Sequence, residues 1–310
     1  MLKVAMVGLG DIAQKAYLPV IAGMREQVEP ILSTRNGQTL AKLKAQYAIA
    51  QVATDYQQVL QMQPDAIMIH SATDSHFKLA KQAIEAGIAV FIDKPVSYKL
   101  AETEQLVNLA SQKNQPLFVG FNRRYAPAHQ ALKADLSGNN PVHINYQKHR
   151  YNLPDEPRIF VLDDFIHVLD SVCFFAGIDT QLSYDNLQVF NHKQTSKLAH
   201  VQVQWQQQGM LLTAQMNRLN GRTEEHVTCY GENKTWQVRD LTDTEYYAGS
   251  EEKKVSANDW RSTLEKRGFN AMLSSFFEQV EVGRSPNEQY QSILTSHQLA
   301  EYVTRQIEQC

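Results

Sequence analysis

The feature that most constrains the fold is an alternation of short apolar runs and longer helical patterns along residues 1–121. Apolar runs occur at residues 3–7, 30–33, 66–70, 89–92 and 117–121, and helical patterns at 39–47, 74–86 and 99–113. The runs are apolar throughout, as expected for strands that helices cover on both faces. This β-α-β-α order predicts a doubly wound parallel sheet, an α/β Rossmann domain.

After Asn122 the rhythm changes. A helical pattern at 126–136 precedes a strand at 142–149 and a helical block at 163–175. Strand-like runs follow at 187–191, 198–206, 209–216, 226–230 and 235–240, and helices are expected near 268–282 and 288–308. Consecutive strands joined by tight turns predict antiparallel pairing. We therefore expect a dinucleotide-binding domain at 1–121 and, at 122–310, an α+β substrate-binding and oligomerisation domain with an open, mostly antiparallel sheet.

Composition narrows the possible partners. Thirty Lys and Arg against 33 Asp and Glu leave a formal charge of -3, so nothing favours nucleic acid or an anionic membrane. No apolar run approaches the roughly 20 residues of a membrane span, and Asp11, Gln14 and Lys15 argue against a signal peptide. Cys173, Cys229 and Cys310 are far apart, which favours a reducing, cytoplasmic setting without disulfides. We expect no metal site.

The first apolar run leads directly into Gly8-Leu9-Gly10-Asp11-Ile12-Ala13, a G-x-G-x-x-A pattern. In such a pattern the first glycine permits a tight turn, the second lets the backbone approach a pyrophosphate, and the alanine allows close helix packing. The helix start offers unpaired N–H groups to the phosphates. Ordinary turns also show this spacing, but its position between strand and helix favours dinucleotide binding at Gly8, Gly10, Asp11 and Ile12.

The end of the second apolar run bears on the choice of cofactor. An acidic residue there would bind the ribose 2′-hydroxyl of NAD, whereas this segment reads Ser33-Thr34-Arg35-Asn36. An arginine can hold a 2′-phosphate through two parallel hydrogen bonds. The alternative is a solvated arginine in a surface turn. We expect NADP rather than NAD, bound through Thr34 and Arg35.

Two further strand ends carry candidate residues. Ser71-Ala72-Thr73-Asp74-Ser75-His76 follows residues 66–70, where Thr73 or Asp74 can cap the next helix. Asp93-Lys94-Pro95 follows residues 89–92, and Pro95 biases Lys94 toward an extended backbone. Both segments lie at the carboxyl edge of the predicted sheet, where ligands bind in such folds. The plainer alternative for Lys94 is a surface lysine at the end of a strand.

A second constellation lies in the helical block. Asp163 and His167 are four residues apart, so on a helix they share a face. A carboxylate that touches an imidazole fixes its tautomer and raises its basicity, which suits a proton acceptor in alcohol oxidation. The alternative is that Asp163 or Asp164 caps the helix and His167 is half-buried beneath the sheet.

Together these motifs resemble the Gfo/Idh/MocA oxidoreductases, in the order G-L-G-D-I-A, S-A-T-D-S-H, D-K-P, G-F-N-R-R-Y and D-D-F-I-H-V-L-D. The resemblance covers essentially the whole chain. It is closest to the MviM-type virulence-factor oxidoreductases, through V-G-F-N-R-R, the K-H-R of residues 148–150 and residues 260–269. The family's Glu-Lys-Pro is Asp-Lys-Pro here, its glycine two residues after the aspartate is Phe165, and T-P-N-x-x-H becomes Ser71-Ala72-Thr73 with His76.

The resemblance implies hydride transfer between nicotinamide and a secondary alcohol, with Lys94, Asp163 and His167 as catalytic residues. It places Ser71, Thr73, His76, Asp93 and Lys94 beside the cofactor. The expected substrate is a small polyol (a sugar, cyclitol or diol) or the matching carbonyl compound. Candidate substrate-binding residues are Arg124, Lys148, Arg150, Asp163 and His167, with Tyr151, Arg218, Trp260 and Arg267 as further candidates.

Two alternatives stay open at this point. One is an NADP-binding sensor that turns nothing over, and the other is a different reaction on the same scaffold, such as bile-pigment or dihydrodiol oxidoreduction. An open sheet with one uncovered face is an interaction surface, so we also expect a homodimer or homotetramer formed through the second-domain sheet.

Overall fold

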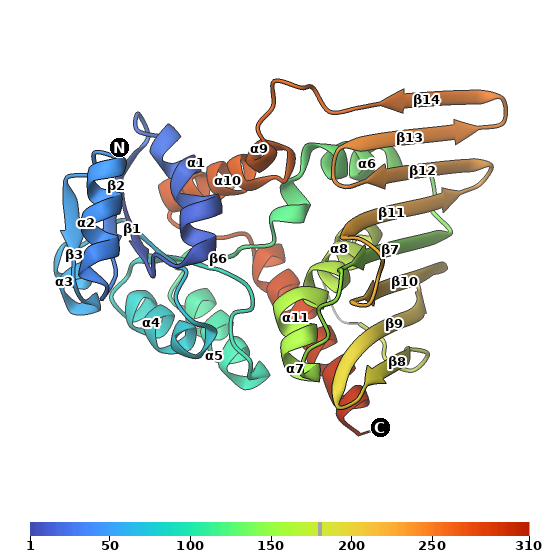
Figure 1. Ribbon diagram of the computed structural model, residues 1–310, viewed down its shortest axis with the longest axis horizontal. Helices are drawn as coiled ribbons and strands as arrows, with labels where there is room; N and C mark the ends of the chain where they lie inside the picture. Colours follow the sequence, from blue (N-terminus) through green and yellow to red (C-terminus); the bar gives the residue numbers. More distant parts are fainter. Residues whose placement is uncertain (179–181, 310) are drawn as a thin grey trace. The chain divides into compact units, whose positions relative to one another are not determined.

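The computed structural model describes residues 1–178 and 182–309 (Figure 1). The chain forms two compact units, which we call the first and second unit. The first contains residues 1–120 and 269–294, and the second contains residues 121–268 and 295–310. In the described part of the chain, each helix is either too short or too polar to cross a lipid bilayer.

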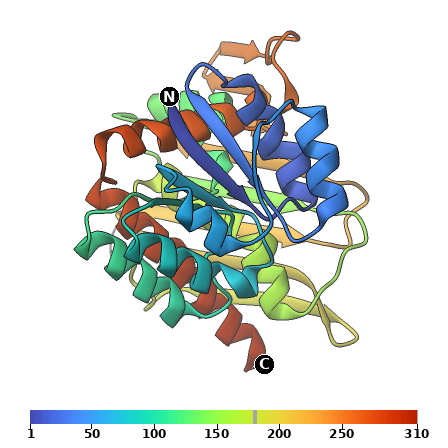
Figure 2. The ribbon, with the colours of Figure 1, turned by 90° about the vertical axis from the view of Figure 1, so that its left-hand side faces the viewer.

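The first unit holds a six-stranded sheet in the order β3-β2-β1-β4-β5-β6, in which every neighbouring pair is parallel. Val4, Met6 and Ile67 are fully buried, because helices cover both faces of the central strands. Figure 2 shows the blue and the green-blue helices on opposite sides of these strands. The predicted doubly wound parallel sheet is therefore confirmed. Its strands are β1 (Leu2–Val7), β2 (Val28–Ser33), β3 (Gln51–Ala53), β4 (Ala66–Ile69), β5 (Ala89–Ile92) and β6 (Leu117–Val119).

The helices of this unit lie between the strands in the predicted order. They are η1 (Ala13–Tyr17), α1 (Leu18–Gly23), α2 (Gly37–Gln46), α3 (Tyr56–Gln61), α4 (Thr73–Glu85) and α5 (Leu100–Gln112). The prediction missed β3 and α3. A strand of three residues is too short to show periodicity, and α3 has six residues, with only Val59 buried. Its start is nevertheless capped, since Asp55 Oδ1 accepts a hydrogen bond from the Gln58 backbone N–H at 2.9 Å.

The C-terminal helix α10 (Phe269–Val282) packs in the first unit, not in the second as expected. The ring of Phe276 lies 5.4 Å from that of Phe91 and 5.7 Å from that of Phe118. The expected division at 1–121 and 122–310 therefore needs correction, because residues 269–294 return to cover strands β5 and β6. An apolar helix does not show from its own sequence which distant sheet it will cover.

The second unit holds an eight-stranded sheet in the order β14-β13-β12-β11-β7-β10-β9-β8. Neighbouring strands are antiparallel except for the parallel pair β7 and β10, which confirms the expected mostly antiparallel sheet. Its strands are β7 (His143–His149), β8 (Gln188–Gln194), β9 (Lys197–Gln207), β10 (Met210–Asn217), β11 (Glu224–Gly231), β12 (Lys234–Arg239), β13 (Asp243–Ala248) and β14 (Glu251–Val255). The prediction missed β13 and β14. Every residue of the edge strand β14 is exposed, so its sequence shows no alternation of apolar and polar residues.

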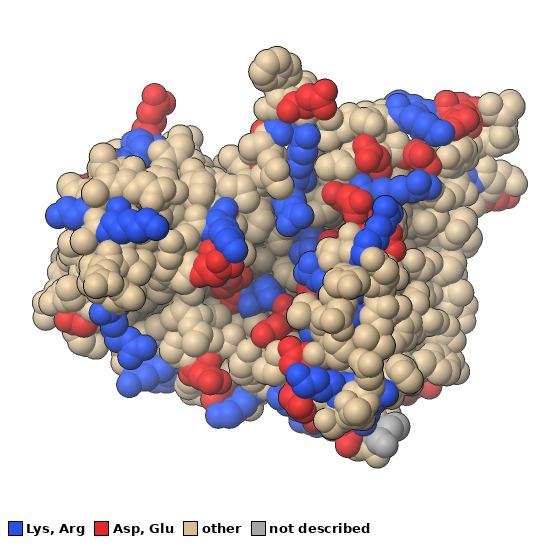
Figure 3. Space-filling view, viewed as in Figure 1, with Lys and Arg blue, Asp and Glu red and all other residues tan. Residues whose placement is uncertain are grey.

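Helices cover one face of this sheet. Ile144, Tyr146 and Leu212 point to the covered face and are fully buried, while Asn145 and Gln147 alternate with them on the other face. Figure 3 shows basic and acidic side chains interspersed on the side in view. The remaining helices are η2 (Asn122–Tyr125), α6 (Pro127–Leu136), α7 (Pro157–Phe160), η3 (Val161–Phe165), α8 (Ile166–Ala176), α9 (Thr263–Lys266) and α11 (Asn287–Glu308).

Two of the three cysteines lie in the described part of this unit. Cys173 and Cys229 are buried free thiols, and burial raises the pKa of each to about 12. Both thiols are buried and free, as expected of cysteines that pack as small apolar side chains. Cys310 lies outside the described residues.

Candidate functional site

A cavity of about 840 Å³ lies in the first unit. It is lined by the loops that follow β1, β2 and β4, which is the carboxyl edge where the sequence placed a dinucleotide. Five predicted cofactor-binding residues line it: Gly8, Gly10, Thr34, Arg35 and Ser71. Two lining residues that the sequence analysis missed are His70 and Lys78. A polar residue directly after an apolar strand was the available signal for His70.

Gly8 and Gly10 form the part of the cavity where a pyrophosphate fits. Gly8 has φ +88°, and a Cβ added to it would lie 2.5 Å from the backbone nitrogen of Ser71. A Cβ added to Gly10 would meet nothing within 4 Å, so the space beside its backbone is open. Helical residues 11–23 begin directly after it, and their first N–H groups are available to an anion. The residues present therefore fit a dinucleotide phosphate.

Asp11 and Ile12, unlike Gly8 and Gly10, do not line the cavity. Their side chains are exposed, and that of Asp11 pairs with Lys15 at 2.8 Å. Neither residue belongs to the cavity lining, so only their backbone N–H groups at the helix start suit a phosphate. Ala13 is fully buried against the sheet, as the motif predicts.

Two cations line the cavity, Arg35 from the loop after β2 and Lys78 from α4. Arg35 and Lys78 are exposed on its lining, while Asn36 holds the loop by accepting a hydrogen bond from the Thr39 backbone N–H at 3.0 Å. Among the described residues that line the cavity, Asp55 is the sole carboxylate. Asp55 already caps α3, so the lining favours an anionic ligand.

His76 joins two loops and does not line the cavity. Its Nδ1 lies 2.9 Å from the carbonyl oxygen of Pro95, and its Nε2 lies 2.9 Å from the carbonyl oxygen of Ser71. The ring is almost fully buried, so its contacts are with the backbone of the loops after β4 and β5. His76 therefore positions both loops.

The expected cap of α4 is wrong. The helix begins at Thr73, so its N-cap is Ala72, which has no side-chain oxygen to accept a hydrogen bond. Thr73 and Asp74 lie in the first turn instead. Ser75 Oγ donates to the Ala72 carbonyl oxygen at 2.7 Å and lies 2.6 Å from Ser71 Oγ, and these contacts hold the loop.

Asp93 is an anchor for the Asp-Lys-Pro turn, in which the Lys94–Pro95 peptide bond is cis. Its Oδ1 accepts hydrogen bonds from the Tyr17 hydroxyl at 3.2 Å and from the Lys94 backbone N–H at 2.9 Å. Burial raises the pKa of the Asp93 carboxyl, against the opposing charges of Lys94 and His76. A Cβ on Gly120 would lie 2.7 Å from the Tyr17 hydroxyl oxygen, so a glycine leaves room for this contact.

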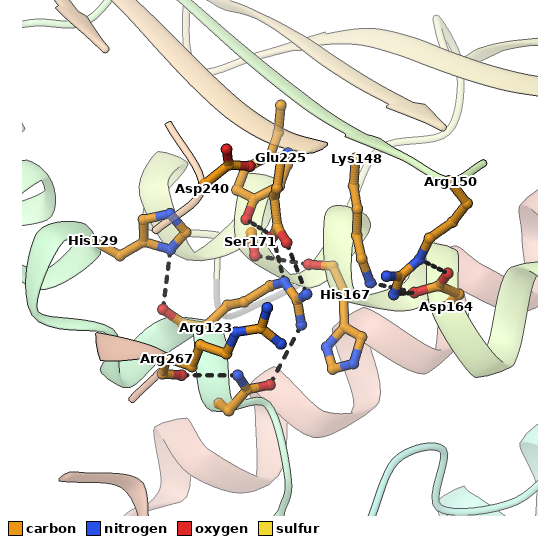
Figure 4. Close-up of polar contacts among 12 residues, drawn as sticks. Arg123, His129, Lys148, Arg150, Asp164, His167, Ser171, Glu225, Asp240 and Arg267 are labelled. Atoms are coloured by element: carbon orange, nitrogen blue, oxygen red, sulfur yellow. Dashed lines mark hydrogen bonds and ion pairs between the residues drawn. The ribbon is translucent and has the colours of Figure 1, made fainter. Parts of the chain in front are cut away.

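In the second unit, Asp164 is the centre of a charged group that we call the Asp164 cluster (Figure 4). Arg150 donates to it twice, from Nε to Oδ2 at 2.9 Å and from Nη2 to Oδ1 at 3.0 Å. Arg218 Nη2 donates to Oδ2 at 3.2 Å, and Lys148 Nζ donates to Oδ1. Burial disfavours the carboxylate, but Lys148 and Arg150 hold the pKa of Asp164 well below its ordinary value.

Lys148 is almost fully buried in the Asp164 cluster. Burial and the charge of Arg123 lower its pKa well below the ordinary value, although Asp164 opposes the shift. Arg150 keeps 32% of its side chain exposed, so it is the accessible cation of the cluster. The structure thus brings together two predicted substrate-binding residues and adds Asp164, which the sequence analysis treated only as a helix cap.

A second buried pair lies beside this cluster. Arg123 Nη2 donates to Glu225 Oε2 at 2.9 Å, and Arg123 Nε and the Tyr146 hydroxyl both donate to Oε1. Burial disfavours the charged carboxylate, yet Arg123 overcomes this and lowers the pKa of Glu225 to about 2. The sequence analysis missed Glu225, because its partner lies 102 residues away.

Arg124 pairs with Asp170 and not with the Asp164 cluster. Its Nη2 donates to Asp170 Oδ1 at 2.6 Å, and its Nε lies within 3.1 Å of both carboxylate oxygens. Ser296 Oγ donates to the same carboxylate at 2.7 Å. The contacts of Arg124 are those of a structural ion pair.

His167 lies at the start of α8 and is buried. Figure 4 shows its ring in the same group of side chains as Lys148 and Arg123. Asp163 belongs to the preceding π-helical turn η3, so the α-helical spacing that we assumed for the pair does not apply throughout. The proton-accepting pair of Asp163 and His167 stays a prediction.

The further candidates differ in exposure. The residues Tyr151 and Trp260 are exposed by 67% and 96%. Arg218 belongs to the Asp164 cluster, and the Arg267 carbonyl oxygen accepts a hydrogen bond from Asn122 Nδ2 at 2.8 Å.

Across the described part of the chain, no group of three or more His, Cys, Asp or Glu side chains is arranged to hold a metal ion.

We predict that Gly10→Ala and Gly8→Ala separate cofactor binding from folding. Gly10→Ala leaves the melting temperature near that of the wild type, because the added methyl meets no protein atom. It raises the Kd for NADP at least about tenfold, since the methyl fills the approach of the pyrophosphate. Scanning calorimetry and a fluorescence titration check the two effects.

Gly8→Ala is the matched control. Its methyl meets the Ser71 backbone, and a left-handed alanine costs about 1–2 kcal/mol, so the melting temperature falls. Wild-type NADP affinity in Gly10→Ala contradicts the proposed phosphate position.

We predict that Glu225→Gln destabilises the second unit in a pH-dependent manner. The folded pKa, about 2, lies below the ordinary value of 4.5, so the stabilisation is complete above pH 4.5 and is lost as pH falls toward 2. The shift corresponds to about 3 kcal/mol at neutral pH. Urea unfolding at pH 7, 4.5 and 3 should show the difference between wild type and variant narrowing.

Glu251→Gln, at an exposed position of β14, is the control and should show no such difference. A Glu225→Gln difference that stays constant down to pH 3 would mean that the Arg123–Glu225 pair contributes nothing pH-dependent.

Comparison with known proteins agrees with this geometry. The model of the oxidoreductase family with an NAD-binding Rossmann fold matches residues 2–121, and that of the YceM-like C-terminal domain matches residues 127–249. The crystal structure of a Gfo/Idh/MocA family oxidoreductase from Vibrio cholerae is 40% identical, with a TM-score of 0.93, over 100% of this chain and 99% of that one.

Two further relatives cover nearly the whole chain. The crystal structure of the dehydrogenase MviM from Clostridium difficile is 27% identical, with a TM-score of 0.89, over 98% of this chain and 99% of that one. YceM of Salmonella typhimurium, whose name describes it as an oxidoreductase, is 28% identical over 98% of this chain and 97% of its own.

A shorter match reaches a protein with a named substrate. Inositol 2-dehydrogenase of Gluconacetobacter diazotrophicus is 26% identical over 54% of this chain and 52% of its own length. The family model, the relatives and the cavity at the G-x-G-x-x-A turn agree. The chain belongs to the Gfo/Idh/MocA family and is an NAD(P)-dependent oxidoreductase related to inositol and sugar dehydrogenases.

Proposed function

We propose that the protein transfers hydride between NADP and a secondary alcohol of a small polyol (a sugar, cyclitol or diol). The observation that carries the proposal is the Asp93-Lys94-Pro95 turn at the carboxyl end of β5. Tyr17 and His76 hold this turn through Asp93 and Pro95. In a doubly wound sheet the nicotinamide half of a dinucleotide lies toward β4 and β5, so Lys94 stands on the redox side.

The cofactor supplies the hydride acceptor and donor when it is bound. Lys94 stabilises the negative charge that develops on the substrate oxygen, by presenting its ammonium group to that oxygen. His167 accepts the hydroxyl proton at a ring nitrogen, and Asp163 orients the imidazole. These three roles are the ones that the family resemblance implied.

The Asp164 cluster supports a hydroxyl-rich substrate. Lys148 and Arg150 are donors whose positions Asp164 fixes, and Arg150 is partly exposed. Preorganised donors bind hydroxyl oxygens without a further loss of side-chain freedom. We therefore propose Arg150 as the accessible substrate-binding residue, with Lys148 beside it in the Asp164 cluster, whereas Arg124 lies outside the cluster and pairs with Asp170. The inositol 2-dehydrogenase among the relatives acts, by its name, on such a polyol.

We propose NADP rather than NAD as the cofactor. Thr34, Arg35 and Lys78 line the cavity, and the end of β2 carries no carboxylate. Two cations suit a 2′-phosphate, which a carboxylate at this position would repel.

A non-catalytic NADP sensor was the alternative to an enzyme. Membership in a family of oxidoreductases argues against it. We also propose that the chain forms a homodimer or homotetramer through the uncovered face of the eight-stranded sheet, where Asn145 and Gln147 are uncharged. Sedimentation as a 35.3 kDa monomer would contradict this association.

We predict that Arg35→Ala raises the Kd for NADP by about 10- to 100-fold and leaves the Kd for NAD unchanged. Hydrogen bonds to charged groups contribute about 1.5–3 kcal/mol, and only NADP has the 2′-phosphate. Isothermal titration with both dinucleotides measures the two constants.

Lys81→Ala is the matched control for this substitution. Lys81 lies on the same helix as Lys78 but pairs with Glu85 and does not line the cavity. If Arg35→Ala weakens both dinucleotides equally, the arginine does not read the 2′-phosphate.

We predict that Lys94→Ala and His167→Ala each lower kcat by about 10²- to 10⁴-fold while the Kd for NADP stays within about threefold. Reduced nicotinamide is followed at its absorbance band with a panel of sugars, cyclitols and diols. Lys99→Ala is the control, because Lys99 lies five residues after Lys94, is exposed and pairs with Glu102. Unchanged turnover in Lys94→Ala or His167→Ala refutes the assigned role.

A further inference from the structure

His70 is a buried histidine on the wall of the dinucleotide cavity. It follows β4 directly, and its backbone N–H donates to the Val7 carbonyl oxygen at 2.8 Å, which places it beside the end of β1. Only 5% of the residue is exposed, yet it lines the cavity. None of the roles assigned above uses this side chain.

Neither ring nitrogen of His70 has a hydrogen-bond partner among the described residues. A buried polar group without a partner costs about 1–3 kcal/mol, and native structures rarely retain one without a reason. An imidazole in such a place needs a partner that the described residues do not provide.

The protein side of the ring is aromatic. Tyr17 packs on it with ring centroids 4.1 Å apart, and Phe91 lies 5.9 Å away. The Tyr17 hydroxyl donates to Asp93, so it does not serve His70. Both ring nitrogens are themselves buried, and the cavity that His70 lines is the open space beside the residue. We therefore infer that a hydrogen-bonding partner approaches from the cavity.

The charge state of the His70 ring limits which chemical groups can be its hydrogen-bond partner. Burial, together with the charge of His76, lowers the pKa of His70 to about 3. The ring is thus neutral near pH 7 and offers one donor and one acceptor. A neutral imidazole suits a hydroxyl or an amide better than a phosphate, which favours cationic or multiple N–H donors.

The position in the sheet selects the half of the cofactor. The strand order reverses between β1 and β4, and a dinucleotide lies across this point. Thr34 and Arg35 follow β2 on one side of it, whereas His70 follows β4 on the other, next to the strand that ends at Lys94. His70 therefore belongs to the nicotinamide half.

We propose that His70 is a cofactor-binding residue whose ring hydrogen-bonds a neutral polar group of the nicotinamide half, either a ribose hydroxyl or the carboxamide. The contact orients that half of the cofactor, while Tyr17 holds the plane of the imidazole. The proposal rests on the dinucleotide-dependent function above, but it depends on neither the polyol substrate nor the choice of NADP over NAD.

The test compares a whole dinucleotide with its adenosine half. His70→Phe keeps a ring for Tyr17 and Phe91 but removes both nitrogens. It should raise the Kd for NADP about tenfold, the effect of one hydrogen bond, and leave the Kd for 2′,5′-ADP within about twofold. Arg35→Ala is the matched control and should weaken both ligands. Equal changes for both ligands in His70→Phe, or none, overturn the proposal.

A second measurement does not depend on the variant. In a crystal structure of the wild-type chain with NADP, a ring nitrogen of His70 should lie about 2.7–3.2 Å from a ribose or carboxamide atom. A ring that contacts only protein or water overturns the proposal, even if His70→Phe fails to fold. If the wild type binds dinucleotide through His70 but oxidises no polyol, the proposed function fails and this inference stands. If it binds neither NADP nor NAD, both fail.

Discussion

The close approach of two backbone segments at Gly8 and Ser71 is the constraint on which the first unit depends. A side chain at Gly8 would overlap the Ser71 backbone nitrogen, so the loops after β1 and β4 can meet only through a residue without a Cβ. Their contact forms the floor of the cavity and leaves the Gly10 backbone open above it. Packing therefore requires the glycine at position 8, and the same turn leaves the backbone of Gly10 open, as a phosphate would need.

The Asp-Lys-Pro turn illustrates how the surroundings of a functional residue are built. The Asp93 carboxylate accepts hydrogen bonds from the Tyr17 hydroxyl and from the Lys94 backbone N–H. The His76 ring contacts the backbone carbonyl oxygens of Ser71 and Pro95. Each contact restrains the backbone around Lys94. Such restraint holds in place the residue to which the proposed function gives a catalytic role.

In the second unit, several charged side chains are buried together as ion pairs. The Asp164 carboxylate accepts hydrogen bonds from Lys148, Arg150 and Arg218, so three buried or half-buried cations share one carboxylate partner. The Arg123–Glu225 pair repeats the arrangement beside it. Ion pairs of this kind contribute little net stability relative to an apolar core, because desolvation opposes them. They hold the donor groups in fixed positions, which supports the substrate-binding role proposed for Lys148 and Arg150.

Local patterns in the sequence determined the parallel sheet, the antiparallel sheet and the glycine turn, because periodicity and glycine spacing act over a few residues. The G-x-G-x-x-A turn and the strand ends at Arg35 and Lys94 needed no long-range information. Only the tertiary structure decided that α10 covers β5 and β6 and that Asp164 is the charged centre beside Asp163. It also decided that His70 lines a cavity and that its ring nitrogens have no hydrogen-bond partner among the described residues. These outcomes depend on residues that lie tens to hundreds of positions apart, and on a π-helical turn that changes which side chains share a face.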